Sequence, residues 1–195
     1  VDAALAQLTP DTVSDIMFTS GTTGRPKGVI TTHGRIIPMF AEWNKYVGLT
    51  AGDPYLIINP FFHSFGYKAG WVAALIAGAL IVPMAVFDVE KAIHHIEHDR
   101  IAFIPGAPTI YQSLLTALEG GRRFDSSSLK SAMTGAATVP PALIRRMYDE
   151  LGFDRVLTSY GMTECTCITS CKPGDPPELV AGSCGVAING MEVKI

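Results

Sequence analysis

The stretch Thr19-Ser20-Gly21-Thr22-Thr23-Gly24-Arg25-Pro26-Lys27-Gly28 concentrates features that bind phosphate. Its three glycines let the backbone approach a ligand closely, and its four hydroxyl residues can donate to phosphate oxygens. Lys27 adds a compact positive charge, and Pro26 stiffens the turn before it. The preceding residues, Asp15-Ile16-Met17-Phe18, predict a short strand. The stretch is therefore a loop at a strand end, where α/β folds bind ligands.

This loop differs from a Walker P-loop, in which Gly-Lys is followed by Ser or Thr. Here Pro26 precedes Lys27, and Gly28 follows it. A flexible polar hairpin is the alternative interpretation, because Gly, Thr and Pro are ordinary turn residues. Ten residues that end in Pro-Lys-Gly favour phosphate binding. The loop resembles the phosphate-binding signature of acyl-adenylate-forming enzymes, which include acyl-CoA ligases, luciferases and the adenylation domains of peptide synthetases.

A second motif, Tyr160-Gly161-Met162-Thr163-Glu164, follows a predicted strand at residues 155–157. Taken alone, it also fits a helix N-terminus with Thr163 as the cap. Beside the first loop, it makes the resemblance to the adenylate-forming family specific. In that family the matching Tyr packs against adenine, the Thr reaches the α-phosphate and the Glu holds Mg²⁺. A carboxylate suits this ion, which takes oxygen ligands and few of them from protein.

The resemblance implies a set of catalytic and ATP-binding residues. The catalytic residues would be Thr163, Glu164 and Lys27, with Glu164 as the Mg²⁺ ligand and the loop from Thr19 to Lys27 on the β- and γ-phosphates. The implied ATP-binding residues are Thr19, Ser20, Gly21, Thr22, Thr23, Gly24, Lys27, Gly135, Ala136, Ala137, Tyr160, Gly161, Met162 and Thr163.

Two further segments fit a site for an organic acid. In Thr134-Gly135-Ala136-Ala137-Thr138, small residues at a strand end would let a flat group lie on the backbone, although a simple tight turn fits equally well. His63 lies among aromatic residues, and we interpret it as lining a pocket rather than transferring a proton. The resemblance implies an acyl-substrate pocket formed by four residues, and neighbouring aromatic residues would make the region apolar. The pocket residues are His63, Phe65, Gly66 and Gly135, and the neighbours are Phe61, Phe62 and Trp71.

Strands and helices alternate along the chain. Strands are predicted at residues 15–18, 55–58, 80–82, 101–104, 129–133, 155–157 and 192–195, and helices at 33–47, 67–77, 89–99, 109–118 and 140–151. Thr32 and Asp88 are expected to cap helices, and Pro105-Gly106 to end a strand. The alternation predicts an α/β fold with a mostly parallel sheet and helices on both faces. The motif-bearing loops would then open at one edge of that sheet and meet around one ligand.

Composition narrows the class of protein. With 195 residues, 48% of them hydrophobic and 17% charged, the chain can form a globular domain with a substantial core. The net charge of −3 gives no electrostatic footprint for nucleic acid. The spacing of Cys165, Cys167, Cys171 and Cys184 fits no common zinc pattern, so we expect free thiols in a reducing, cytoplasmic environment.

An uncharged apolar run from Ala69 to Phe87 is long enough to span a bilayer. Gly78 and Pro83 divide it, which favours a buried helix followed by a buried parallel strand. We therefore expect no integral membrane span.

The segment His94-His95-Ile96-Glu97-His98 matches the H-x-x-E-H pattern of one class of zinc peptidases. Val89, Ile93 and Ile96 form the apolar stripe of this predicted helix, so the histidines mostly face away from the core. A solvated helix face is the favoured interpretation over a zinc site.

The resemblance covers Asp11 to Ile195. Within the family, Asn59-Pro60-Phe61-Phe62-His63 and its Gly66-Tyr67-Lys68-Ala69-Gly70 extension look most like fatty-acid CoA ligases. A closer likeness is to actinobacterial ligases that activate acids from sterol-ring breakdown. The implied reaction joins a carboxylic acid to AMP, with release of pyrophosphate, and then to coenzyme A. The implied cofactors are ATP, Mg²⁺ and coenzyme A as co-substrate.

Members of this family are longer at both ends. We therefore expect residues 1–195 to be a single fragment of the AMP-binding N-terminal domain, without the C-terminal lid domain and unable to turn over by itself. Two other functions stay open: an adenylation domain that loads a carrier protein, and a nucleotide-binding module without ligase activity. A homodimer is also left open.

Overall fold

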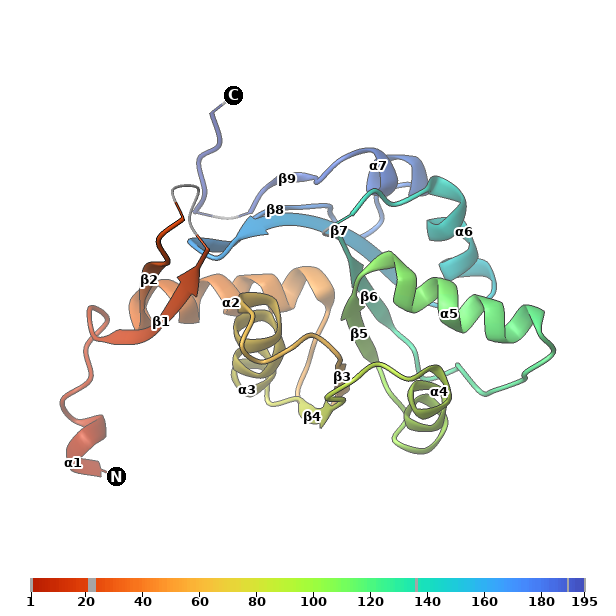
Figure 1. Ribbon diagram of the computed structural model, residues 1–195, viewed down its shortest axis with the longest axis horizontal. Coiled ribbons are helices and arrows are strands. Elements are labelled where there is room, and N and C mark those ends of the chain that lie inside the picture. Colours follow the sequence, from red (N-terminus) through yellow and green to blue (C-terminus); the bar gives the residue numbers. More distant parts are fainter. Residues whose placement is uncertain (1, 21–23, 136, 189, 195) are drawn as a thin grey trace.

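The computed structural model describes residues 2–20, 24–135, 137–188 and 190–194 (Figure 1). Gly21, Thr22, Thr23 and Ala136, which the resemblance assigns to the ATP site, lie outside these ranges. Two sheets are present in the described part: a two-stranded sheet and a seven-stranded sheet with the order β4-β3-β5-β6-β7-β8-β9.

The large sheet is parallel from β4 to β7 and antiparallel from β7 to β9. Its parallel part runs through central strands whose residues are fully buried, as expected where helices cover both faces of a sheet. The strands are β3 Pro54–Ile57, β4 Leu80–Pro83, β5 Phe103–Gly106, β6 Ser131–Thr134, β7 Arg155–Met162, β8 Cys165–Ser170 and β9 Val186–Ala187.

Helices cover both faces of the sheet, which confirms the predicted fold class (Figure 1). On one side lie α2 His33–Val47, the π-helix η1 Phe65–Val72 and α3 Ala73–Ala77. On the other lie α4 Val89–His98, α5 Pro108–Glu119 and α6 Pro141–Asp149, with α7 Pro177–Gly182 beside α6. A short helix, α1 Asp2–Leu5, precedes them near the N-terminus. Aromatic residues join the layers: Trp43 and Tyr55 each pack against Phe103, with ring centroids 5.7 and 4.7 Å apart.

Most helix boundaries follow from local chemistry. The Asp88 carboxylate accepts a 2.8 Å hydrogen bond from the Lys91 backbone N–H and caps α4 as predicted. Pro108 and Pro141 occupy first-turn positions, where a missing N–H costs no helical bond. Thr32 occupies the N-cap position of α2, but its side chain makes no capping bond, so that prediction is wrong in mechanism.

The first predicted strand does not join the parallel sheet. β1 Val13–Thr19 pairs antiparallel with β2 Lys27–Thr32, so the glycine-rich loop connects the two strands of a hairpin. The expectation that all motif-bearing loops open from one parallel sheet is therefore wrong for this loop. The physical reason is that residues 27–32 stay extended and satisfy the β1 backbone locally.

The second motif also lies on a hairpin. β7 continues through Tyr160-Gly161-Met162, and Thr163 and Glu164 form the turn into β8. The alternative of a helix N-terminus capped by Thr163 is therefore wrong. Three further elements, β8, α7 and β9, were not predicted from the sequence. Residues 192–194, predicted as a strand, are not one.

Two buried-strand predictions need correction. β4 is parallel to β3 as expected, but it is the edge strand, and Leu80 is 58% exposed. β5 starts at Phe103 and continues through Pro105 and Gly106, because a Pro removes only one donor while its carbonyl still accepts, here from Asn59 Nδ2. None of the helices in the described part of the chain has the length and apolarity to cross a bilayer.

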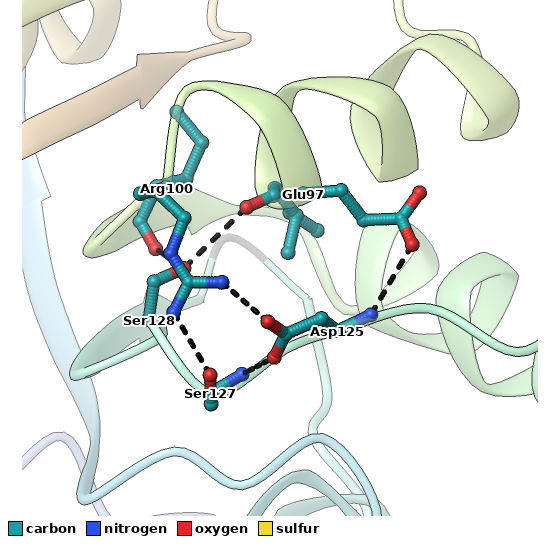
Figure 2. A network of polar contacts seen from close by, with 7 residues as sticks. Glu97, Arg100, Asp125, Ser127 and Ser128 are labelled. Atoms are coloured by element: carbon teal, nitrogen blue, oxygen red, sulfur yellow. Dashed lines mark hydrogen bonds and ion pairs between the residues drawn. The ribbon is translucent and has the colours of Figure 1, made fainter.

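A polar cluster fixes the amino-terminal edge of the sheet (Figure 2). Arg100, in the turn between α4 and β5, donates to Asp125 Oδ2 at 2.5 Å and to Ser127 Oγ at 2.9 Å. The Asp125 backbone N–H donates in turn to the Glu97 carboxylate at 3.3 Å. Ser128 Oγ donates to the Ile101 carbonyl at 2.9 Å. These contacts attach the segment before β6 to the turn before β5.

Candidate functional site

An open cleft of about 900 Å³ lies at the carboxyl ends of β6 and β7. Its walls come from the β1–β2 hairpin, the start of η1 and the β7–β8 hairpin, and α2 contributes Trp43 to its lining. The described lining residues are Thr19, Ser20, Lys27, Trp43, His63, Ser64, Phe65, Ala69, Met133, Thr134, Gly135, Ser159, Tyr160, Gly161, Met162, Thr163, Glu164, Thr166 and Cys167.

The cleft brings together most of the residues that the sequence assigns to the site, although they come from four distant segments. These are Thr19, Ser20, Lys27, His63, Phe65, Gly135, Tyr160, Gly161, Met162, Thr163 and Glu164. Three described residues of the predicted set, Gly24, Gly66 and Ala137, are not part of the described lining. Gly66 instead lies against backbone, where a Cβ would come within 2.2 Å of the Pro60 carbonyl oxygen.

The phosphate-loop hairpin presents hydroxyls and a cation at one wall. Thr19 and Lys27 are register partners at the loop end of the hairpin, one on each side of the loop. Lys27 is exposed and its side chain belongs to the cleft lining. A flexible ammonium beside hydroxyl groups can reach a polyanion that enters from solvent.

The opposite wall is the β7–β8 hairpin, which depends on one glycine. A Cβ on Gly161 would lie 1.9 Å from the Thr166 carbonyl oxygen, so only glycine permits the two strands to approach this closely. The pairing is irregular between Tyr160 and Met162, which turns this end of the hairpin. Tyr160 is 47% exposed and presents an aromatic face at the rim of the cleft.

Glu164 is the acidic group of the cleft. It is exposed at the hairpin turn, beside the half-buried Thr163. Among the described residues, no group of three or more His, Cys, Asp or Glu could hold a metal ion by itself. A single carboxylate fits Mg²⁺, because this ion keeps several waters and shares its other positions with phosphate oxygens.

The floor of the cleft combines apolar groups with two unpaired hydroxyls. Trp43 and Met133 are each 1% exposed and supply apolar surface. Thr134 Oγ1 and Thr166 Oγ1 are buried and have no hydrogen-bond partner among the described residues. Gly135 has no side chain, so its backbone is uncovered at this point. A Cβ there would lie 3.3 Å from the Ser159 carbonyl oxygen.

Sequence reasoning missed several lining residues. The missed residues are Trp43, Ser64, Ala69, Met133, Thr134, Ser159, Thr166 and Cys167. Helical periodicity could have indicated Trp43, because Ile36, Phe40, Trp43 and Val47 repeat on the buried face of α2. Thr166 and Cys167 gave no such signal, because they lie on the unpredicted strand β8.

His63 is held in one orientation. Its Nδ1 accepts a 3.1 Å hydrogen bond from the Phe65 backbone N–H, which leaves Nε2 to carry the proton of the neutral ring. Of the aromatic residues expected around it, only Phe65 belongs to the described lining. Phe62 is 87% exposed, and Trp71 packs against Tyr67 at a centroid distance of 4.8 Å.

The cysteines and the histidine cluster do not add chemistry to the cleft. All four cysteines are free, as predicted. Burial raises the pKa of the Cys167 thiol to about 12, so it stays protonated near neutral pH and is a poor nucleophile. His94 and His98 are exposed on α4, which confirms a solvated helix face.

Open α/β sheets bind ligands at the carboxyl ends of their strands, and at this edge a hairpin with hydroxyls and a cation shares a cleft with a carboxylate. The family profile described as AMP-binding enzyme matches residues 2–195, and the chain therefore belongs to that family.

Individual relatives are similar over the whole chain. One is a 7a-methyl-1,5-dioxo-octahydro-1H-inden-4-yl propanoyl:CoA ligase of Rhodococcus jostii (strain RHA1), 52% identical over 100% of this chain and 38% of that protein. The ligase of the same name from Mycobacterium tuberculosis (strain ATCC 25618 / H37Rv) is 49% identical, with the same coverage of 100% and 38%. The chain thus spans about two fifths of the length of these relatives.

A solved structure gives the same picture of the fold. The O-succinylbenzoate coenzyme A synthetase of Bacillus subtilis, in complex with ATP and magnesium ion, is 33% identical with a TM-score of 0.81. The match covers 96% of this chain and 38% of that chain.

Proposed function

We propose that residues 1–195 are the AMP-binding part of the N-terminal domain of a longer ATP-dependent acyl-CoA ligase. The observation that carries the proposal is the single cleft that joins Lys27 and its hydroxyl neighbours, the Thr163–Glu164 turn and a floor with apolar residues. The 52% identity to a CoA ligase supports it. The four free thiols fit a reducing, cytoplasmic setting.

ATP would bind across the mouth of the cleft. The loop from Thr19 to Lys27, which includes Gly21, Thr22, Thr23 and Gly24, would hold the β- and γ-phosphates, and Thr163 the α-phosphate. Tyr160 would pack against adenine, and the small residues from Gly135 to Ala137 would support the base. Bound at Glu164, Mg²⁺ would supply positive charge next to the phosphates.

The first step would be attack of the acid's carboxylate oxygen on the α-phosphorus. The bond to the bridging oxygen breaks, and pyrophosphate leaves with the electron pair. In the second step the coenzyme A thiolate attacks the acyl carbon, and AMP leaves. The chain's own residues contribute by positioning the acid beside the α-phosphate and by neutralising charge, which is the main catalytic work in phosphate chemistry of this kind.

The acid would be compact and would carry carbonyl groups away from its carboxylate. Trp43, Phe65 and Met133 offer apolar surface. The Thr134 and Thr166 hydroxyls have no hydrogen-bond partner among the described residues, so each could donate to a ring carbonyl of the acid. The dioxo-indenyl propanoyl group named for the two relatives has this character. His63 Nε2–H would face the acid's carboxylate end.

Acid-dependent exchange of labelled pyrophosphate into ATP, measured on the complete protein, tests the activation step. We expect exchange with bicyclic keto acids and weaker exchange with straight-chain fatty acids of similar size. A screen of acceptors would follow, in which coenzyme A should release AMP and a carrier protein should not. Exchange by no acid would contradict the ligase. Exchange with transfer only to a carrier protein would favour an adenylation domain instead.

The isolated 195-residue chain is a separate arm of the same test. We expect it to release no pyrophosphate at rates comparable to those of the complete protein. Comparable rates would contradict the proposal that further segments are required for turnover.

A further inference from the structure

Lys68 is a fully buried cation to which the sequence assigned no role, although it lies in the Gly66–Gly70 extension quoted above. Its side chain is 1% exposed, and it lies in η1, just beyond the His63–Phe65 wall of the cleft. Its Nζ donates to Thr31 Oγ1 at 2.7 Å and lies 3.3 Å from Asp15 Oδ1. The Asp15 side chain is only 10% exposed. An ammonium is rarely buried unless it is paired, so these contacts account for its position.

The contacts of Lys68 fall on both strands of the phosphate-loop hairpin. Asp15 on β1 and Thr31 on β2 are register partners, so one ammonium attaches to a single cross-strand pair. Within the described residues the hairpin has no ladder bonds to the seven-stranded sheet. Backbone bonds from His33 and Gly34 to residues 12 and 10 attach the end remote from the loop. The Asp15–Thr31 pair is the second from that remote end, so Lys68 adds a side-chain contact at the base of the hairpin, from which Thr19 and Lys27 extend to the cleft.

The positive charge of Lys68 also acts on Cys165 in the β7–β8 hairpin. Cys165, the first residue of β8, directly follows Glu164. Burial raises the pKa of the Cys165 thiol, and the positive charge of Lys68 opposes this rise. In addition, η1 packs against β8, so the helix that carries Lys68 contacts the β7–β8 hairpin as well as the Asp15–Thr31 pair.

We propose that Lys68 is a positioning residue, whose contacts with Asp15 and Thr31 fix the base of the phosphate-loop hairpin and thereby set where Thr19 and Lys27 lie relative to the Thr163–Glu164 turn when Mg-ATP binds. The proposal rests on the ATP site proposed above. A buried ion pair is a costly way to hold elements together, because apolar residues of similar volume often stabilise as well or better. Here the directional contact is the hydrogen bond from Lys68 Nζ to Thr31 Oγ1, while the Asp15 carboxylate, which makes no hydrogen bond among the described residues, adds charge attraction at 3.3 Å.

Two variants of the complete protein separate positioning from stability. Lys68→Met leaves Asp15 as an unpaired buried carboxylate, which should lower the melting temperature. The double variant Lys68→Met/Asp15→Asn removes both charges and should recover most of that loss. The matched control is Lys130→Met/Asp53→Asn, which removes the 2.6 Å ion pair at the other edge of the sheet.

Calorimetric titration with Mg-ATP and with AMP gives the deciding ratio. AMP lacks the β- and γ-phosphates, so a displaced loop should weaken Mg-ATP binding selectively. We expect both Lys68 variants to bind Mg-ATP about tenfold more weakly and AMP within about twofold of the parent. The Lys130 control should change neither affinity. Equal weakening of both nucleotides, or parental Mg-ATP affinity in the double variant, would overturn the proposal.

Hydrogen exchange tests the positioning without any ligand. Amides of residues 13–19 and 27–32 should exchange faster in the double variant than in the parent, while those of β5 and β6 should not change. Unchanged exchange in the hairpin would also overturn the proposal. If the parent bound no Mg-ATP, the proposed function would fail, and the exchange data alone would decide whether Lys68 positions the hairpin.

Discussion

The two edges of the parallel sheet differ in whether their buried polar side chains are hydrogen-bonded within the described residues. At the amino-terminal edge, Asp53 accepts from Lys130 at 2.6 Å and from the Thr50 hydroxyl at 2.7 Å. The Arg100 cluster is likewise satisfied by its own members (Figure 2). At the carboxyl-terminal edge, the Thr134 and Thr166 hydroxyls are buried and lack partners among the described residues.

This difference distinguishes an edge whose polar groups support the fold from an edge that we propose binds a ligand. Buried polar groups in folded proteins are almost always hydrogen-bonded, so an unsatisfied group requires an explanation. At one edge polar residues bond to one another, and at the other two buried hydroxyls belong to residues that line the cleft and have no partner among the described residues. Substitutions of polar side chains at the carboxyl-terminal edge should therefore change function more than stability, and those at the amino-terminal edge the reverse.

The largest effect is expected for Glu164→Gln, which keeps the shape of the side chain but removes the charge proposed to hold Mg²⁺. Acid-dependent pyrophosphate exchange in the complete protein should fall about 100-fold or more, with an unchanged melting temperature. The matched control is Glu178→Gln, which removes an exposed carboxylate that pairs with Arg145. Equal exchange rates in the two variants would remove Glu164 from the proposed site.

Gly161→Ala tests whether the cleft wall depends on close backbone approach. The added Cβ would meet the Thr166 carbonyl oxygen at 1.9 Å, and backbone cannot move aside as a flexible side chain would. We expect a loss of about 1–3 kcal/mol in the free energy of unfolding, together with weaker nucleotide binding. The control is Gly182→Ala, since a Cβ there meets nothing within 4 Å. Denaturant titration that gave equal midpoints for both would contradict the close approach.

The hydroxyls on the floor should affect the acid more than ATP. Thr134→Val and Thr166→Val remove a hydroxyl and keep the shape of the side chain. For a keto acid, kcat/KM should fall about 5- to 20-fold in each variant, because a donor to a carbonyl is lost. For a matched acid without the ketone, kcat/KM should stay within about twofold. A similar loss for both acids would show that the hydroxyls support the fold alone.

Helix and strand order could be predicted well because it depends on short-range chemistry. Asp88, Pro108 and Pro141 mark helix starts in the sequence, and the structure has helices there. Pairing between strands could not be predicted in the same way. Whether residues 13–19 join the parallel sheet or pair locally with 27–32 depends on which partner meets their backbone in three dimensions.

The candidate site shows the same contrast between patterns that are local in the sequence and contacts that form only in the folded chain. Glycine, hydroxyl and charged residues clustered in the sequence identified both motifs, because such clusters have few structural uses, but not that each motif lies on a hairpin. Lys68 was missed as a link, since a lone lysine in a helix is normally exposed. Its burial arises only because Asp15 and Thr31 arrive beside it from another element. Contacts of this kind are visible only in the folded chain.

The smallest effect is expected at the amino-terminal edge, from Asp125. Hydrogen bonds from Ser127, and then the Arg100 guanidinium, lower the pKa of this exposed carboxyl to about 2. The pKa of Asp in an unfolded chain is about 3.9, so folding favours the charged form of Asp125. Its contribution to stability is present above about pH 4 and is lost as the pH falls toward about 2. Asp125→Asn should flatten the acid limb of a plot of urea midpoint against pH, and leave nucleotide binding at pH 7 unchanged. Parallel acid limbs for the variant and the parent would mean that the Arg100 cluster orders this edge without stabilising it.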